Sequence, residues 1–302
     1  MRSVRKSCFL LLCLGLSLTL LVAQEKKLRE PDVVFVPTPQ EVVDEMLKVA
    51  NVHKGDVVYD LGCGDGRLVI GAAQKYGARG VGIDIDPERI KESKDNAAKA
   101  GVSNLVQFLE QDLFQTDFHE ATVMTLYLLS SVNRRLRPKL LQELKPGTRV
   151  VSHDFDMDEW KPDQSSEVLA DDISHDVFLW IIPANVSGTW TWTMGKPAVK
   201  CEMNLEQLFQ VPSGSATIGG AAAEIKGLTL KGDQIWFTVE RPFEGKLVPM
   251  AFEGKVAGHN ITGKIKFQAG GKESVWDWKA GRNPATEKPI DNERGNNSFR
   301  VN

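Results

Sequence analysis

Cysteine is scarce in this sequence, with four among 302 residues. Cys8 and Cys13 lie near the N-terminus, while Cys63 and Cys201 are far apart in the chain. No pairing can be argued from these positions, so we expect two free thiols at 63 and 201. An excess of one charge is also lacking, because the formal net charge is −3. It gives no overall attraction to nucleic acid, and neither a nucleic-acid partner nor a metal is predicted.

The N-terminus has the layout of an export signal. Arg2, Arg5 and Lys6 precede an apolar or small stretch over residues 8–23. This layout predicts a secretory signal peptide over residues 1–24, or an uncleaved membrane anchor, although the run is short for a bilayer span. The protein is therefore expected to be exported or membrane-anchored (periplasm or envelope), with membrane association through this segment.

Residues 57–86 read VVYDLGCGDGRLVIGAAQKYGARGVGIDID, and the chain is organised around them. The apolar run at 57–59 predicts a buried strand, and the apolar periodicity over 68–76 predicts a helix. A second strand is expected over 80–83 and stops at Asp84. Strand, glycine turn, helix, strand and acid together are one half of a nucleotide-binding α/β unit.

The turn after the first strand has the spacing Asp-x-Gly-x-Gly-x-Gly. Glycine allows φ > 0 and a close approach of ligand to backbone. The spacing differs from the Gly-x-Gly-x-x-Gly that seats a pyrophosphate. It resembles motif I of the class I S-adenosylmethionine (SAM) methyltransferases, whose ligand has a ribose but no phosphate. The resemblance implies SAM as methyl donor, with the turn around its methionine part and the second acid on the ribose. The contacts predicted here are Asp60, Gly62, Gly64, Gly66, Asp84 and Ile85.

Three further residues are predicted to contact SAM. Thr38 lies in an aromatic-x-Pro-Thr segment before a helix expected over 41–50. It either caps that helix or, as a similarity to lysine methyltransferases implies, contacts the methionine end of SAM. Asp112 and Leu113 follow a strand expected over 105–109. The family resemblance implies contacts with adenine, and the alternative for Asp112 is a cap on the following turn.

Three residues are candidates for the transfer chemistry. Tyr127 lies at the C-terminal end of a strand expected over 121–129, where ligands bind in parallel sheets. It is predicted to line the SAM and transfer site, with packing in the core as the alternative. His153 and Asp154 follow a strand expected over 148–152. Either could accept a proton from the nucleophile, or backbone amides could satisfy Asp154.

The remaining elements of the first part complete a mostly parallel, doubly wound sheet. A basic helix is expected over 132–144, and its charges are interpreted as a solvated face. Residues 156–176 are expected to be a loop or short helix. A second helix is expected over 87–100 and a last strand over 177–182.

After Pro183 the helical periodicity stops. Seven short alternating segments predict a small antiparallel barrel or sandwich over residues 184–281. They are expected at 188–194, 199–209, 225–230, 234–239, 247–256, 261–267 and 274–278. The polar end of the chain, 282–302, is predicted to be disordered.

Residues 25–183 are most similar to the protein-lysine methyltransferases of the ATP synthase c-subunit and adenine nucleotide carrier type. The segments that carry the resemblance are PTP, DLGCGDGR, GVGIDIDP, QDLF and LRPKLLQELKPGTRVVSHDF. It implies SAM-dependent N-methylation of a protein lysine. A small-molecule methyltransferase and a non-catalytic envelope protein that reuses the fold stay open as alternatives. The export signal conflicts with the cytosolic supply of SAM.

Overall fold

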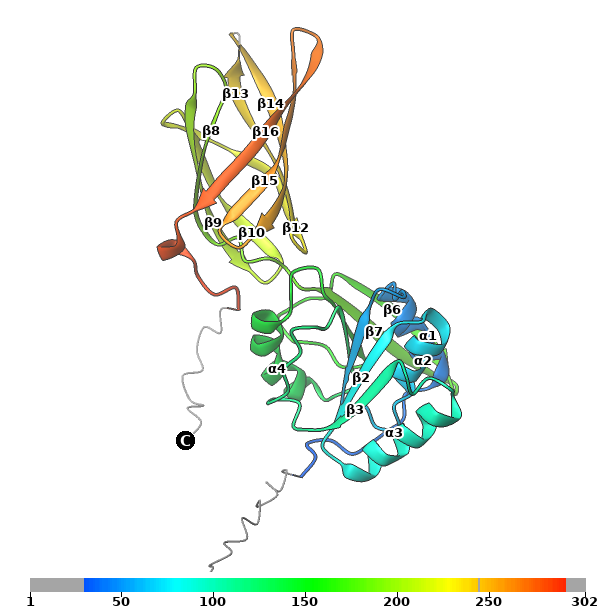
Figure 1. Ribbon diagram of the computed structural model, residues 1–302. Coiled ribbons are helices and arrows are strands. Elements are labelled where there is room, and N and C mark those ends of the chain that lie inside the picture. The colour runs from blue at the N-terminus through cyan, green and yellow to red at the C-terminus, as the bar shows by residue number, and fades with distance from the viewer. Residues whose placement is uncertain (1–29, 244, 292–302) are drawn as a thin grey trace, which may run out of the picture.

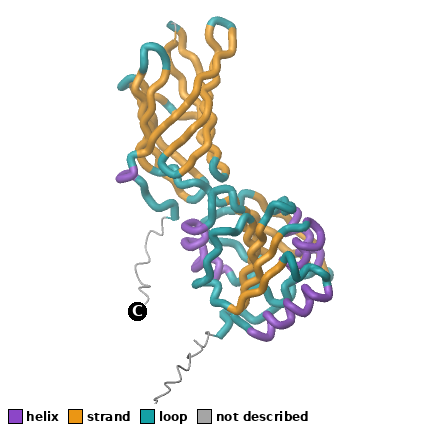
Figure 2. Tube along the Cα trace, viewed as in Figure 1, coloured by secondary structure: helices purple, strands orange, loops and turns teal. Residues whose placement is uncertain are grey.

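The computed structural model describes residues 30–243 and 245–291. These residues form two sheets that follow one another along the chain (Figure 1). Helices accompany the first sheet, whereas the second consists almost entirely of strands (Figure 2). The predicted signal or anchor, 1–24, lies outside the described residues. Among the helices that are described, none is long and apolar enough to cross a membrane.

The first sheet has seven strands in the order β3-β2-β1-β4-β5-β7-β6. Strands β1 to β5 are parallel, and β7 is antiparallel to both β5 and β6. The chain runs outward from β1 to β3 and then returns to β4 on the other side of β1. This reversal is the topological switch point, where open α/β sheets bind ligands. The strands are β1 Val57–Leu61, β2 Arg79–Asp84, β3 Val106–Glu110, β4 Val123–Leu126, β5 Arg149–His153, β6 Gln164–Ala170 and β7 Ile173–Ile181.

Both faces of this sheet are buried, and alternate residues of a strand serve opposite faces. Val58 packs under α1, α2 and α3, whereas Val57 and Tyr59 pack toward α4 on the other face. Figure 1 shows α4 on one side and the other three helices on the opposite side. The helices are α1 Gln40–Val49, α2 Arg67–Tyr76, α3 Pro87–Lys99 and α4 Ser130–Glu143.

Two local predictions for the first part are wrong. Residues 156–176 are no mere loop, because they contain β6 and the start of β7, which form an antiparallel hairpin. Alternation along β6 is hidden in the sequence because β6 is an edge strand with mostly exposed polar side chains. Thr38 does not cap α1, whose N-cap is Pro39 without a side-chain hydrogen bond. The Thr38 hydroxyl lies 3.3 Å from His153 Nδ1 instead.

The second sheet has nine antiparallel strands in the order β11-β10-β9-β8-β16-β15-β14-β13-β12. It curls until β10 and β12 approach one another, so that it is nearly a closed barrel (Figure 1). Its core is aromatic, with Trp190, Trp192, Phe237, Phe252 and Trp278 buried. The strands are β8 Gly188–Met194, β9 Val199–Leu208, β10 Val211–Ile218, β11 Ala221–Ala223, β12 Ile225–Lys231, β13 Gln234–Phe243, β14 Lys246–Ala257, β15 Asn260–Ala269 and β16 Lys272–Arg282.

The predicted fold class is confirmed, a mostly parallel α/β sheet followed by an all-β unit. Strands β10 and β11 were missed, because VPSGSATIGGAAA consists of small, glycine-rich and proline-containing residues with low strand propensity. The predicted disorder from 282 onward is wrong as far as Asp291. The short helix η1 Pro284–Thr286 follows β16, and Ile290 is buried. The rest of that predicted tail lies outside the described residues.

The two units meet in a small buried contact. Phe209, which follows β9, stacks on Trp160 with ring centroids 5.7 Å apart. Trp160 Nε1 donates to Gln210 Oε1 at 2.8 Å, and Gln210 Nε2 donates to the Lys161 carbonyl at 2.8 Å. Phe209 thereby joins the apolar core on the α4 face of the first sheet.

Candidate active site

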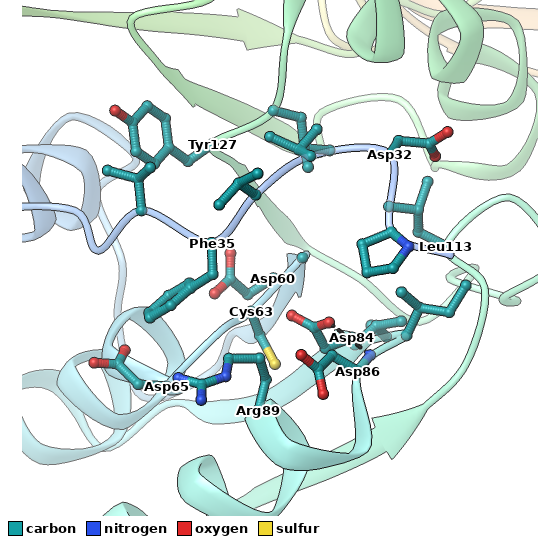
Figure 3. Close-up of a pocket in the computed structure, with 18 of the residues that line it drawn as sticks. Asp32, Phe35, Asp60, Cys63, Asp65, Asp84, Asp86, Arg89, Leu113 and Tyr127 are labelled. Carbon is teal, nitrogen blue, oxygen red and sulfur yellow. Dashed lines mark hydrogen bonds between the residues drawn. The ribbon is translucent and has the colours of Figure 1, made fainter. Parts of the chain in front are cut away.

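A cavity of about 630 Å³ lies at the switch point, beyond the C-terminal ends of β1, β2 and β4. Gly62 and Cys63 follow β1, Ile85 follows β2, and Tyr127 and Leu128 follow β4. The entry segment, residues 30–38, runs across the cavity and supplies Asp32, Phe35 and Thr38, among others, to its wall. Figure 3 shows this segment passing over the acids Asp60, Asp84 and Asp86.

The turn between β1 and α2 owes its shape to its glycines. Gly62, Gly64 and Gly66 have φ of 77°, 52° and 82°, in the left-handed region that favours glycine. The Gly64 amide donates to Asp84 Oδ2 at 2.9 Å, and the Asp86 amide donates to Asp84 Oδ1 at 3.0 Å. The carboxylate at the tip of β2 therefore holds the turn, and its remaining lone pairs are available to a ligand hydroxyl.

Phe35 lies directly on this turn. A Cβ at Gly64 would meet two carbons of the Phe35 ring at 2.1 and 2.5 Å. The Arg89 guanidinium lies 5.1 Å from the centroid of the same ring. Glycine at 64 thus allows the entry segment to close over the backbone of the turn.

Asp60 is the most deeply buried acid of the cavity, and it is 3% exposed. Burial, together with the negative charges of Asp84 and Asp65, raises its pKa to about 7. A hydrogen bond from Thr125 Oγ1 to Asp60 Oδ1, 2.7 Å long, opposes this rise. A cation beside Asp60 would favour its ionised form.

The charges around the cavity select for positive ligands. Arg67 is already paired with Asp65 at 2.6 Å and donates to the Thr38 carbonyl, and Arg89 is paired with Glu92. SAM carries a sulfonium and an ammonium group, so this lining suits it. Six carboxylates line the cavity against two guanidinium groups: Glu30, Asp32, Asp60, Asp65, Asp84 and Asp86 against Arg67 and Arg89.

The structure brings most of the predicted SAM contacts together. Those that line the cavity are Thr38, Asp60, Gly62, Asp84, Ile85, Leu113 and Tyr127. Gly64 and Gly66 lie in the same turn without lining the cavity, where they shape its backbone. The contact of each residue with SAM stays a prediction.

Asp112 does not line the cavity. Its Oδ1 accepts a hydrogen bond from the Phe114 amide at 3.0 Å, which is the turn-capping geometry named as the alternative. The neighbouring Gln111 lines the cavity and was not predicted. Its position in the sequence, between β3 and the predicted contact Leu113, could have identified it.

The candidate transfer residues lie one behind another. Tyr127 lines the cavity, and the His153 ring stacks on the Tyr127 ring with centroids 3.8 Å apart. His153 is fully buried, and neither His153 nor Asp154 lines the cavity. Burial raises the pKa of Tyr127, with a further contribution from Asp154, so its hydroxyl is neutral at physiological pH. A role of His153 or Asp154 as a base stays a prediction.

Sequence reasoning also missed residues that the fold brings to the site. Cys63, Asp65 and Arg67 lie within the turn motif but carry no family role in the resemblance. Asp86 has the sequence pattern of a helix N-cap before Pro87, and it does cap α3 by accepting from the Glu88 amide. His175 lies on β7, in a segment where no strand was expected, and contacts both His153 and Asp154.

Comparison with known proteins agrees with this geometry. Residues 60–164 match the family model described as the ANTKMT methyltransferase domain. A protein-lysine N-methyltransferase of Saccharolobus islandicus is 46% identical over 153 residues, which are 50% of this chain and 95% of that protein. The lysine N-methyltransferase of Mus musculus that is named for the ATP synthase c-subunit is 32% identical over 139 residues, which are 46% of this chain but 56% of that protein.

A crystal structure described as an RNA methyltransferase from Salinibacter ruber, in complex with S-adenosyl-L-homocysteine, is 55% identical to this chain. The match covers 50% of this chain and 96% of that one, with a TM-score of 0.48. The sheet order, the glycine turn and the acidic cavity define a class I SAM-dependent methyltransferase. Because the archaeal relative is matched along almost its whole length, the chain belongs to the family of protein-lysine N-methyltransferases. It is an enzyme, and SAM is its methyl donor.

Proposed function

We propose that the enzyme N-methylates a lysine side chain of a protein substrate. The observation that carries this proposal is the charge of the cavity, which is lined by six carboxylates and two guanidinium groups. Of the six, Asp65 is paired with Arg67 and Asp32 with Arg135, while Arg89 is paired with Glu92 outside the lining. Such a lining attracts a lysine ammonium and repels a phosphate group. The lysine acceptors named for the archaeal and mammalian relatives support the same acceptor class.

SAM supplies a methyl group on a positively charged sulfur, so the leaving group needs no activation by the protein. The acceptor must present a neutral nitrogen, although the reference pKa of lysine is about 10.4. Desolvation would lower the pKa of the amine, and the entry segment, which crosses the cavity, would reduce the access of water. The carboxylates of the lining act in the opposite direction, because they favour the charged ammonium. The contribution of the protein is alignment and water exclusion, with Tyr127 on the wall where the acceptor enters.

A nucleic-acid acceptor would require a basic surface next to the cavity. The interpretation of α4 as a solvated basic face fits Arg134 and Arg135, which are more than half exposed, but not Arg137, which is buried. The four basic side chains of α4 form ion pairs with carboxylates, so they are not free to bind the phosphate groups of a nucleic acid. The pairs are Arg134–Asp158, Arg135–Asp32, Arg137–Asp291 and Lys139–Glu143.

The test is transfer of radiolabelled methyl groups from SAM to three separated substrate pools: extract proteins, total RNA and small metabolites. We expect label in protein that survives nuclease treatment, and methyl-lysine in the digested product by mass spectrometry. Asp84→Ala should abolish transfer, whereas Asp117→Ala, which changes an exposed acid that does not line the cavity, should not. Label confined to RNA or to metabolites would overturn the lysine assignment while leaving SAM binding intact.

We also propose that the N-terminal segment exports the protein or anchors it to a membrane. Support comes from the three basic residues before an apolar stretch. Cell fractionation combined with N-terminal sequencing tests this proposal. A cytosolic protein that retains its first residues would contradict it and would remove the conflict with SAM supply.

A further inference from the structure

Behind Tyr127, three side chains bring lone-pair atoms to one point. His153 Nε2 lies 3.0 Å from His175 Nδ1 and 3.2 Å from Asp154 Oδ2, and His175 Nδ1 lies 3.1 Å from the same oxygen. The three atoms therefore form a nearly equilateral triangle. Three ligand atoms bound to one tetrahedral Zn²⁺ at 2.0–2.1 Å are about 3.3 Å apart, so the triangle has nearly the size of one face of such a coordination shell.

Hydrogen bonds alone explain this triangle poorly. A neutral His153 ring carries one proton, on either Nδ1 or Nε2. If that proton is on Nδ1, which faces the Thr38 hydroxyl, then Nε2 presents a lone pair to the carboxylate oxygen. A proton on His175 Nδ1 can be donated to both His153 Nε2 and Asp154 Oδ2. The contact between those two atoms then has no proton, so two acceptors face one another. A cation at the centre would satisfy all three lone pairs at once.

Neighbouring groups hold the three residues in place by hydrogen bonds, as is usual for metal-binding side chains. His153 Nδ1 lies 3.3 Å from Thr38 Oγ1, and Asp154 Oδ1 accepts from the Asp176 amide at 2.9 Å. The Asp154 amide in turn donates to the Asp176 carbonyl. Asp154 has a φ of 57°, a left-handed conformation that aspartate and asparagine adopt more readily than most other residues with a Cβ. The backbone at the end of β5 is thus bent so that the carboxylate faces the two imidazoles.

We propose that His153, Asp154 and His175 bind one first-row divalent transition-metal ion, with Zn²⁺ as the natural occupant. Two imidazoles and one carboxylate are a ligand set for Zn²⁺ and its neighbours rather than for Mg²⁺ or Ca²⁺, which prefer oxygen ligands. Three protein ligands leave at least one position of the ion open. Asp154 is partly exposed, so water or a substrate oxygen can reach that position.

The place of the site gives the ion a structural role in the cavity wall. It would join the end of β5 to β7, and through Thr38 it would connect to the entry segment that crosses the cavity. It lies one ring behind Tyr127, outside the residues that line the cavity. A His153 ring that binds the ion through Nε2 is not a base for the acceptor lysine at that nitrogen.

The test uses the full chain without a polyhistidine tag, freed of metal by dialysis against a chelator. Titration with Co²⁺, followed by its visible absorption, should show one ion per chain, and Zn²⁺ should displace it. His175→Ala and Asp154→Asn should each weaken Co²⁺ binding by at least about 100-fold, the upper end of what loss of a second-shell partner costs. Calorimetry with SAM on both variants checks that they remain folded.

A matched control exists on the surface. Asp117, His119 and Glu143 also gather ligand atoms, but Asp117 and His119 are exposed, and His119 Nδ1 lies 4.0 Å from Glu143 Oε2. His119→Ala should leave Co²⁺ binding unchanged. The proposal is overturned if the wild type binds no Co²⁺ or Zn²⁺, or if folded His175→Ala and Asp154→Asn proteins bind as the wild type does. These outcomes do not depend on which acceptor the enzyme methylates.

Discussion

At the scale of single residues, Asp60 couples the ligand to pH. Its carboxylate is buried among other acids and is half protonated near neutral pH, because its pKa is about 7. SAM brings a sulfonium, an ammonium and a carboxylate, and so a net positive charge, to a cavity whose floor is Asp60. The bound cation favours ionised Asp60, so binding below pH 7 must release a proton.

We therefore expect the dissociation constant of SAM to depend on pH with a defined sign. Below pH 7 the free protein holds a proton on Asp60 that SAM must displace, and affinity should fall by up to about tenfold per pH unit. Toward pH 7.5 the group is largely ionised and the affinity should level off. Calorimetric titrations with SAM at half-unit steps between pH 5.5 and 7.5 measure the slope.

The control for this prediction is Asp60→Asn, which keeps an oxygen for the hydrogen bond from Thr125. The variant should bind SAM more weakly at pH 7.5 and with a flat pH profile. A wild-type slope that persists in Asp60→Asn would assign the titration to another group.

How well the sequence predicts a site residue depends on whether its role is local. Asp60 and Asp84 were found because the turn motif fixes their positions on consecutive strands. Asp112 was assigned to adenine from the family pattern, while its geometry is that of a local cap. His175 was missed because only the pairing of β5 with β7 brings it to His153, 22 residues away.

At the scale of elements, the entry segment and the glycine turn fit one another. Gly64 has no Cβ where the Phe35 ring rests, and its φ of 52° is also costly for any other residue. Gly77, at the C-terminus of α2, has a similar φ of 68°, but a Cβ there would meet only Lys54 Cγ at 3.8 Å. Substitutions at the two glycines therefore differ in one respect. Both incur the free-energy cost of a left-handed backbone, but only the one at Gly64 must also displace Phe35.

We expect Gly77→Ala to cost about 1–2 kcal/mol, from the left-handed backbone alone. Gly64→Ala should cost more, because the Phe35 ring must also leave its place. In a Phe35→Ala background the cost of Gly64→Ala should fall to that of Gly77→Ala. Thermal unfolding measures the series, at roughly 2–4 °C per kcal/mol for a unit of this size. If Gly64→Ala lowers the melting temperature equally in the wild type and in the Phe35→Ala background, the entry segment does not rest on the glycine turn.

Elements were predicted where periodicity is strong and missed where it is weak. The bounds of β1, α2, β2 and α3 fall within two residues of those expected, because each has a buried face of regular period. β6 and β10 were missed, and each exposes half or more of its side chains. An exposed strand is stabilised mainly by backbone hydrogen bonds to its neighbouring strand. Its side chains therefore show little alternation from which the strand could be predicted.

At the scale of the whole molecule, the β-unit is attached to the enzyme through a side chain that it contributes to the apolar core on the α4 face of the first sheet. Phe209 is 3% exposed, stacks on Trp160, and lies with its ring centroid 5.0 Å from the Arg137 guanidinium. The Phe209 amide donates to the carbonyl of Ile290, and Asp291 accepts from Arg137 at 3.0 Å. The last described residues therefore return to α4 beside the same contact.

This arrangement predicts that loss of the Phe209 ring destabilises the methyltransferase unit, whereas loss of a ring inside the β-unit core does not. Phe209→Ala and Phe252→Ala each delete a buried ring, at a cost of about 3–5 kcal/mol. Phe252 packs within the barrel core, on Phe237, Trp192 and Trp278. Calorimetric scans with and without SAM identify the two units. The unfolding transition whose temperature rises with SAM is that of the methyltransferase unit. Phe209→Ala should lower that transition by several degrees, whereas Phe252→Ala should leave it in place and lower the other. If both variants leave the SAM-sensitive transition unchanged, the two units are joined by the chain alone, and the β-unit does not support the active site.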